Sequence, residues 1–309
     1  MLYDLNIAWS PSTSPADLTR TLKFSASLGY DVVALSQTLS VPIPPQLKNP
    51  IPKFDGNHAQ SPHDTLPTVL TRCTVPLADT SVGHHLPRLV NLYDIVAVRP
   101  TNEKGFQVAC LNIDHAYLIS LDLTSYLDFH FKPTMCMAAV KRGMRFEVCY
   151  SQVLGADARG RASFIGNLMQ LARATRGRGI VISSEARNVM GLRGPADVTN
   201  LFAVWGLSTD KGAEALGVNP RGIVVNEGIK RNGFRGVIEI VQVADKPRNN
   251  GDKMEGVEQE TCTERAENQG QKRKGGDTLG QNDASLSKRK AKKMKKLAML
   301  DGKPAENKA

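Results

Sequence analysis

Two polar side chains near the start of the chain have the types and spacing to do chemistry. Asp4 and Asn6 alternate with apolar residues in the stretch YDLNIAW, residues 3–9. Alternation with a period of two is typical of a β-strand, so both side chains face the same way. If this strand is the first of an α/β barrel, they point to the end where such barrels hold metal ligands. The alternative is that both side chains hydrogen-bond neighbouring strand ends.

A metal-dependent phosphoesterase is one enzyme class to consider, with Asp4, Asp122 and Glu185 as its carboxylates. Hydrolytic barrels of the polymerase-and-histidinol-phosphatase (PHP) type combine such carboxylates with several imidazoles, which usually begin as His-x-His on the first strand. The first strand of this chain has no histidine. The six histidines are scattered, at His58, His63, His84, His85, His115 and His130. We therefore predict no metal ligands and favour a structural role for the polar row.

Other catalytic signatures are also missing from the sequence. It contains no G-x-S-x-G nucleophile elbow and no Walker-type phosphate loop. Ser183-Ser184-Glu185 is typical of a cap for the backbone that follows a strand. Arg176-Gly177-Arg178-Gly179 is a weak candidate for a phosphate clamp. We expect no catalytic residue and no cofactor bound by this chain.

The charge of the chain indicates a polyanionic partner. Lys and Arg number 40 against 30 Asp and Glu, which gives a net charge of +10. Residues 244–309 hold sixteen basic and eleven acidic residues, so the part before them is basic in its own right. Of the 24 basic residues in that part, sixteen are Arg. Guanidinium groups bind phosphates bidentately and stack on bases, which favours RNA over a surface that is merely solvated.

The elements that must position these residues follow from the apolar runs. We expect strands near residues 3–8, 31–36, 68–74, 94–99, 116–121, 145–151 and 179–184. Helices are expected to begin at Ser14-Pro15 and Gly194-Pro195, and another to include residues 164–172. The runs 29–35 and 92–98 echo each other, each entered through Tyr-Asp. The alternation predicts an α/β, TIM-barrel-like domain of seven or eight parallel strands over residues 1–243, with an insertion at 38–66.

Beyond residue 243 the hydrophobic periodicity disappears. Residues 244–309 are polar and rich in Gly, Lys and Glu, so we expect a disordered basic tail. Its run 288–296 predicts a nuclear import signal or a nucleic-acid arm, with a solvating tail as the alternative. The basic residues of this run are Lys288, Arg289, Lys290, Lys292, Lys293, Lys295 and Lys296.

Cysteine usage and hydropathy bear on the cellular compartment. Five widely spaced cysteines without a C-x-x-C pair argue against a disulfide framework or a zinc knuckle. The sequence shows no signal-peptide pattern and no apolar run that would span a membrane. We expect the reducing cytosol or the nucleus, and no membrane partner.

An ordered set of short motifs runs along the predicted barrel, from about residue 2 to 242. They are Leu28-Gly29-Tyr30, Val32-Val33-Ala34, Leu70-Thr71-Arg72, Leu92-Tyr93-Asp94-Ile95-Val96-Ala97-Val98, Phe131-Lys132, Arg142-Gly143, Phe146-Glu147-Val148, Tyr150-Ser151, Ile182-Ser183-Ser184, Arg193-Gly194-Pro195, Asp197-Val198, Asn200-Leu201, Gly206-Leu207-Ser208, Arg221, Gly228 and Arg231. In content and order the set resembles the barrel-shaped protein subunit shared by nuclear ribonuclease P (RNase P) and RNase MRP.

The resemblance implies a PHP-like barrel without the metal ligands of that class. It implies a non-catalytic scaffold for the RNase P RNA, and for the RNase MRP RNA, in precursor tRNA and rRNA processing. Magnesium would then sit on the RNA of the holoenzyme. Partners would include precursor tRNA and other protein subunits, among them a small ferredoxin-like one, in the nucleus and nucleolus. Together with the arginine excess, it gives as RNA-binding candidates Arg72, Arg99, Lys132, Arg142, Arg187, Arg193, Arg221, Lys230 and Arg231.

Two enzyme hypotheses compete with the scaffold. The PHP-type phosphoesterase needs a bound metal cluster, for which the sequence has too few imidazoles. An ordinary phosphate-binding metabolic barrel leaves both the arginine excess and the basic run 288–296 unexplained.

Overall fold

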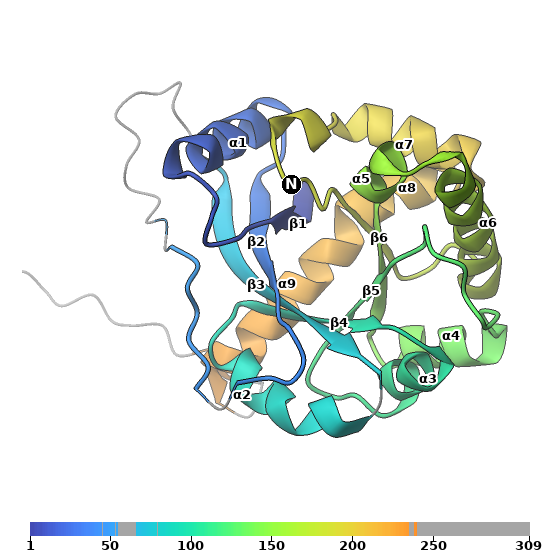
Figure 1. Cartoon of the computed structure of the whole chain (residues 1–309), viewed down its shortest axis with the longest axis horizontal. Coiled ribbons are helices and arrows are strands. Elements are labelled where there is room, and N and C mark those ends of the chain that lie inside the picture. Colours follow the sequence, from blue (N-terminus) through green and yellow to red (C-terminus); the bar gives the residue numbers. More distant parts are fainter. Residues whose placement is uncertain (45, 53, 55–65, 79, 235–237, 240–309) are drawn as a thin grey trace, which may run out of the picture. The chain divides into compact units, whose positions relative to one another are not determined.

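A seven-stranded parallel sheet, curled into a barrel, organises the chain (Figure 1). The computed structural model describes residues 1–44, 46–52, 54, 66–78, 80–234 and 238–239. Within them the strands hydrogen-bond in sequence order, and each neighbouring pair is parallel. The strands are β1 (Tyr3–Ala8), β2 (Val32–Thr38), β3 (Thr68–Leu77), β4 (Ile95–Pro100), β5 (Leu118–Leu121), β6 (Arg145–Cys149) and β7 (Ile180–Ser183). The predicted TIM-barrel-like α/β fold is confirmed, with seven strands in the described sheet.

The barrel closes where the segment after β7 returns to β1. Ala8 donates its backbone N–H to Ala186 at 3.0 Å, and Glu185 donates its own to the Asn6 carbonyl at 2.6 Å. A parallel bridge between Ile7 and Ala186 completes this seam. The β1–β2 register shifts between Asp4 and Ile7. A bulge of this kind breaks the side-chain alternation and re-aims polar groups, so Asp4 and Asn6 reach different partners.

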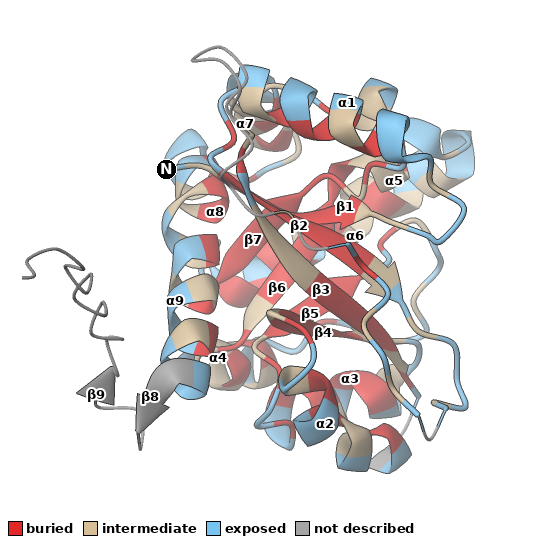
Figure 2. Cartoon of the chain, turned by 90° about the vertical axis from the view of Figure 1, so that its left-hand side faces the viewer, coloured by how far each residue is buried: buried red, intermediate tan, exposed pale blue. Residues whose placement is uncertain are grey.

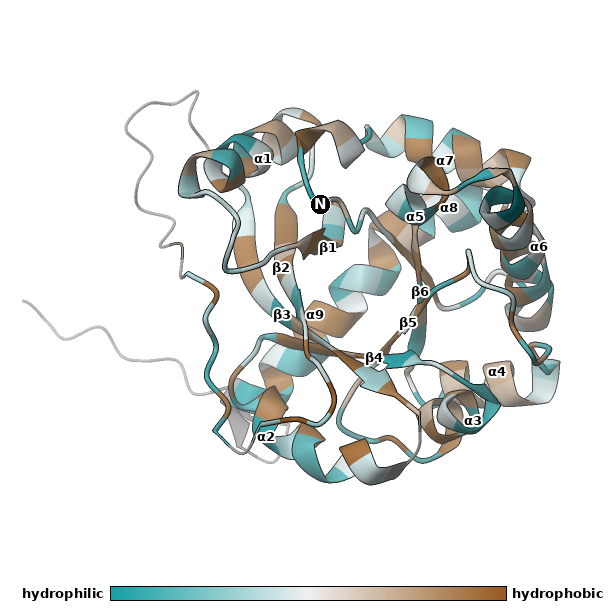
Figure 3. Ribbon diagram, in the orientation of Figure 1, coloured by the Kyte–Doolittle hydropathy of each residue, from teal (hydrophilic) through white to brown (hydrophobic). Residues whose placement is uncertain are grey.

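Helices cover the outside of the sheet. They are α1 (Pro15–Ser27), α2 (Leu86–Val90), α3 (Glu103–Leu111), α4 (Pro133–Lys141), α5 (Tyr150–Gly155), α6 (Ala158–Thr175), α7 (Pro195–Val204) and α8 (Thr209–Leu216), with short 3₁₀ turns η1 (Thr80–His85) and η2 (Val189–Gly191). Figure 2 shows strands buried along most of their length and helices buried on one face. Figure 3 shows apolar residues along the strands and mixed hydropathy on the helices. Strands covered on both sides need such continuous apolar runs, which is why the sequence revealed them.

Helix α9 (Val218–Asn232) is one of the helices that the sequence analysis did not place. It crosses behind the ring of strands in Figure 1. Ile223 packs into an apolar cluster inside the barrel with Tyr3, Leu5 and Val32. At one end of the helix, Asn219 Nδ2 donates to the carbonyl of Ile180, the first residue of β7, at 2.7 Å. Helix α9 therefore closes the amino-terminal end of the barrel.

The two Tyr-Asp segments do the same structural work. Asp31 accepts the backbone N–H of Leu2 at 2.7 Å, and Asp94 accepts that of Thr71 at 2.8 Å. Each carboxylate thereby ties the start of its own strand to the neighbouring strand, at the entry of β1 for Asp31 and at the fourth residue of β3 for Asp94. Tyr30 and Tyr93 are both buried. The echo in the sequence is thus a repeated tether at the amino ends of parallel strands.

Several predictions fall outside the described residues. The boundary at 243/244, the tail and its basic run 288–296 lie there, as do 45, 53 and 55–65 of the insertion. The short antiparallel pair β8 (Gly233–Phe234) and β9 (Ile238–Glu239) is the last described element. Cys73, Cys110, Cys136 and Cys149 are buried free thiols. None of the described helices has the length and apolarity to cross a membrane.

Candidate functional site: the polar interior and mouth of the barrel

The inside of the barrel changes from apolar to polar along its axis. Toward the amino ends of the strands lies the cluster that Ile223 of α9 caps, with Ala34, Ala97, Leu118 and Val181 among its members. Two residues further along their strands, β2, β5 and β7 carry Ser36, Ser120 and Ser183, and β3 carries Thr74; all four residues are buried. Because the carboxyl ends of the strands are where barrels of this type place their chemistry, this polar end is the candidate site.

A buried ion pair lies at the centre of the interior. Arg72 on β3 and Glu147 on β6 are both fully buried, and they join through two N–H···O contacts of 2.5 and 2.6 Å. Arg72 also donates to the Leu5 carbonyl at 2.7 Å and to Thr74 Oγ1 at 3.3 Å. Burial alone would raise the pKa of Glu147, but the charge and hydrogen bonds of Arg72 outweigh it and hold that pKa below its ordinary value. Both members of the pair are therefore ionised, and their opposite charges balance each other inside the barrel.

Asp4 and Asn6 flank this pair on β1. Asp4 Oδ1 accepts the backbone N–H of Ser184 at 2.9 Å, while Oδ2 is buried without a partner among the described residues. Asn6 Nδ2 lies 3.3 Å from Cys149 Sγ and 3.5 Å from Glu147 Oε2. Burial raises the pKa of Asp4 to about 6, against hydrogen bonds from Ser184 and Asn6 that lower it. The predicted hydrogen bonding to a neighbouring strand end is confirmed for Asp4, whereas the contacts of Asn6 are with β6, which is not next to β1.

A second ion pair stands at the open end of the barrel. Arg99, at the exit of β4, donates to Glu185 Oε1 at 2.8 Å and to Ser120 Oγ at 2.9 Å. Gln152 Nε2 donates to the other oxygen of Glu185 at 2.7 Å. Arg99, Gln152 and Glu185 line a cavity of about 780 Å³, to which Asp122, Arg187 and Arg193 also contribute. We call this cavity the mouth.

The carboxylates of the interior and mouth do not suit a metal ion. Glu147 is bound by Arg72, Glu185 by Arg99 and Gln152, and Asp122 accepts Thr124 Oγ1 at 2.7 Å in its own loop. In the described part of the chain, no three His, Cys, Asp or Glu side chains are grouped so as to hold a metal. A ligand set needs lone pairs directed at one point, whereas here guanidinium, amide and hydroxyl donors use the oxygens of Glu147, Glu185 and Asp122, and Asp4 offers its unpartnered Oδ2 alone. The set Asp4, Asp122 and Glu185 does not fit a metal centre.

The predicted set of RNA-binding residues is wrong at Arg72. Its side chain has no exposed surface, and it lies inside the barrel, so it cannot reach a phosphate backbone. The sequence could not reveal this, because Leu70-Thr71-Arg72 fits the alternation of a strand equally well with the arginine inside or outside the barrel. Glu147, its partner, has no predicted role of its own. The signal that could have linked them is a pair of opposite charges, each inside an otherwise apolar strand.

The other candidates divide between the two ends of the barrel. At the carboxyl end, Arg99, Arg187 and Arg193 line the mouth. Arg187 and Arg193 are exposed, although Arg193 also donates to the carbonyls of Met190 and Leu192, both at 2.7 Å. Lys132, at the start of α4, lies 3.3 Å from Glu103 Oε1.

At the amino end, Arg142 braces a loop by donating to the carbonyls of Cys110 and Ile113 at 2.7 and 2.6 Å. Arg221, Lys230 and Arg231 are exposed on α9. Arg231 pairs with Asp94 at 2.6 Å, and Lys230 Nζ stands 3.8 Å from the centre of the Tyr117 ring. The structure therefore does not gather the candidates into one site.

Fold and site together define a class of protein: an α/β barrel with one ion pair buried in its interior and a second at its open end. The model of the family described as RNase P subunit p30 matches residues 1–232. This chain belongs to that family.

The similarity of this chain to known proteins supports the assignment to this family. "Ribonuclease P protein subunit p30" from Mus musculus is 34% identical over 236 residues, which cover 72% of this chain and 84% of that protein. "Ribonuclease P/MRP protein subunit RPP1" from Saccharomyces cerevisiae is 31% identical over 230 residues, covering 70% and 77%. A chain in the cryo-EM structure of archaeal ribonuclease P with mature tRNA has the same fold, with a TM-score of 0.56 and 15% identity, covering 79% of this chain and all of that one. The resemblance drawn from the motifs is confirmed.

Proposed function

We propose that this chain is a non-catalytic, RNA-binding protein subunit of ribonuclease P, and of RNase MRP. One observation supports the non-catalytic part of this proposal: the two glutamates at the polar end of the barrel are already bound by guanidinium groups of the protein. Glu147 pairs with Arg72, and Glu185 pairs with Arg99. A general acid or base needs a free group within reach of a substrate. The chain would act instead through its shape and positive charge.

The partners follow from membership of the family and from charge. The mouse and yeast relatives are named as subunits of ribonuclease P, and the yeast one also of RNase MRP. We infer that this chain binds the RNA of these particles, and with it precursor tRNA and other protein subunits, among them a small ferredoxin-like one. The chemistry of leader removal would belong to the RNA, with magnesium bound there. The excess of arginine before residue 244, together with the net charge of +10, suits such an RNA.

The nucleus and nucleolus are the proposed location. The support is the run 288–296, in which seven of nine residues are Lys or Arg.

Recovery of RNA with the tagged full-length chain tests the proposal. Sequencing should identify one abundant structured noncoding RNA together with tRNA precursors, and the recovered particle should remove 5′ leaders from precursor tRNA. The non-catalytic role is tested in the same particle with Glu185→Gln, which removes a mouth carboxylate while keeping its size. Leader cleavage within about twofold of wild type is expected. A loss of a thousandfold with intact assembly would assign catalysis to the protein, and recovery of no RNA would refute the subunit role.

A further inference from the structure

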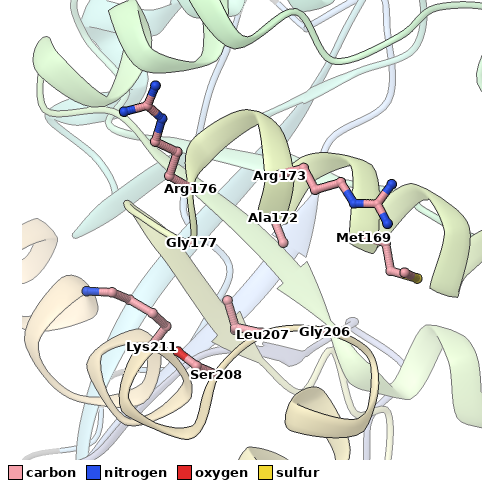
Figure 4. Close-up of a pocket in the computed structure, with 9 residues that line it drawn as sticks. All are labelled: Met169, Ala172, Arg173, Arg176, Gly177, Gly206, Leu207, Ser208 and Lys211. Carbon is pink, nitrogen blue, oxygen red and sulfur yellow. The ribbon is translucent and has the colours of Figure 1, made fainter.

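A second basic surface lies away from the mouth, in a pocket between the end of α6 and the α7–α8 turn. It has a volume of about 350 Å³ and is lined by Arg173, Arg176 and Lys211, with Leu207, Ala172 and Met169 among its apolar residues. Figure 4 shows Leu207 and Ala172 in the middle, Arg176 and Lys211 to one side, and Arg173 to the other. No Asp or Glu is among the described residues that line it. We call it the α6–α8 pocket.

Backbone geometry brings the cations of two helices together here. Helix α6 ends in the left-handed residue Arg176, with φ of 54°, and Gly177 continues in that region at 67°. A Cβ on Gly177 would stand 3.2 Å from Lys211 Cγ and 3.6 Å from Leu207 Cδ1. Glycine therefore permits the close approach of α8. The Arg176-Gly177 part of the weak phosphate-clamp motif thus forms the turn that brings the end of α6 close to α8.

The two arginines of the pocket are uncompensated. Arg173 and Arg176 are exposed, and neither has a hydrogen bond or ion pair of its side chain within the described residues. Lys211 differs, because both Glu214 oxygens lie 2.7 Å from its Nζ. A cation in the last turn of a helix is favoured by the helix dipole, which could explain Arg173 alone. It does not explain a concave surface that draws a further cation from another helix.

We propose that the α6–α8 pocket binds one nucleotide unit of an RNA backbone, its phosphate contacted by Arg173 and Arg176 from opposite sides of the pocket and its ribose or base resting on the half-buried Met169. This rests on the proposed RNA-binding function. Guanidinium groups match the geometry of a phosphate through paired N–H donors. The pocket volume of about 350 Å³ is near the lower limit for small-ligand sites, about 300 Å³, which suits a single nucleotide unit.

Matched pairs of substitutions on α6 test the site. The variant Arg173→Gln/Arg176→Asn removes both guanidiniums, and Asn tolerates the left-handed backbone at 176. The control Arg159→Gln/Arg161→Gln removes the same charge from exposed positions at the other end of α6. Each full-length protein is titrated with an in vitro transcript of the RNase P RNA from the same organism, at several salt concentrations. Thermal melting confirms that both variants remain folded.

The expected effect on RNA binding is that of removing one phosphate contact. The slope of log affinity against log salt should flatten by about 0.7 to 0.9 in the pocket variant, with a three- to tenfold weaker affinity at about 0.1 M salt. The control should keep the wild-type slope. Equal weakening in both pairs would mean that only net charge matters, and an unchanged pocket variant would exclude RNA from the pocket. Either result overturns the proposal.

The two remaining outcomes separate the pocket from the function as a whole. If the pocket variant binds the transcript normally but fails to retain a protein subunit in the particle recovered from cells, the pocket binds an acidic protein surface and the proposal is overturned. If the wild-type chain itself does not bind the transcript, the proposed function fails rather than the pocket alone.

Discussion

At the scale of single residues, the stability of the barrel depends on the Arg72–Glu147 pair in its interior. Removing one member of a buried ion pair strands the other charge, which costs about 3 to 5 kcal/mol, whereas replacing both by apolar residues is often close to neutral. We expect Arg72→Met and Glu147→Leu each to lower the free energy of unfolding by that amount, because both side chains are fully buried. The double variant should lose far less than the sum of the two.

Urea denaturation of the two single variants and the double variant measures this coupling. Should a single variant fail to fold, recovery of soluble protein by adding the second substitution reports the same effect. Additive losses would show that the two charges do not depend on each other.

Asp4 should make stability depend on pH. Its pKa is raised from 3.8 to about 6 in the folded protein, chiefly by burial. The folded state therefore binds a proton more tightly than the unfolded chain, so Asp4 stabilises the fold at low pH. This contribution to the free energy of unfolding, up to about 3 kcal/mol, is lost as the pH rises through 6. Asp4→Asn keeps the oxygen that accepts the Ser184 N–H and removes the charge. The melting temperature of Asp4→Asn minus that of wild type should rise from pH 4.5 to pH 7.5.

Asp128→Asn is the control, because Asp128 is exposed and has no partner among the described residues. Its difference from wild type should stay flat over the same range. A flat difference for Asp4→Asn as well would mean that its carboxyl is not protonated near pH 6.

At the scale of elements, α9 closes the amino-terminal end of the barrel through Ile223. This side chain is 2% exposed and packs against Tyr3 and Leu5. Truncating a buried isoleucine to alanine costs about 2 to 5 kcal/mol, and we expect Ile223→Ala to fall in that range. Val225→Ala, two residues along the same helix and 45% exposed, should change the free energy of unfolding by at most about 0.5 kcal/mol. Urea denaturation compares them, and equal losses would mean that α9 does not cap the interior.

The elements differ in how far the sequence could predict them. Strands such as β4 and β7 were found because a strand covered on both faces is an unbroken apolar run. Helix α9 was missed because Pro220, Gly222 and Gly228 interrupt its pattern and are poor helix formers. Its apolar residues are used at one crossing point rather than along a continuous stripe. The long-range partners of Arg72 and Arg99 were also out of reach, because a period of two cannot say which face of a curled sheet is the inside.

At the scale of the whole molecule, the positive charge has two separate sources. The part before residue 244 is basic through its arginines, while the run 288–296 is basic chiefly through lysines. Arginine suits paired contacts with phosphates, and lysine acts as a mobile point charge. The two parts should therefore contribute differently to RNA binding and to location.

Deletion of residues 244–309 separates these contributions. The deleted sequence lacks the spaced apolar residues that a packed core requires, so the cooperative melt of residues 1–243 should keep its midpoint within about 2 °C. Nuclear accumulation of a fluorescent fusion should fall, because the run 288–296 is removed. Changing its seven Lys and Arg residues to Gln in the full chain should reproduce that fall. If the run also binds RNA, the same variant will flatten the salt dependence of binding by about 0.7 to 0.9 for each phosphate that the run neutralises. A melting midpoint many degrees lower after deletion would show that residues beyond 243 pack against the barrel, and the domain boundary would then be wrong.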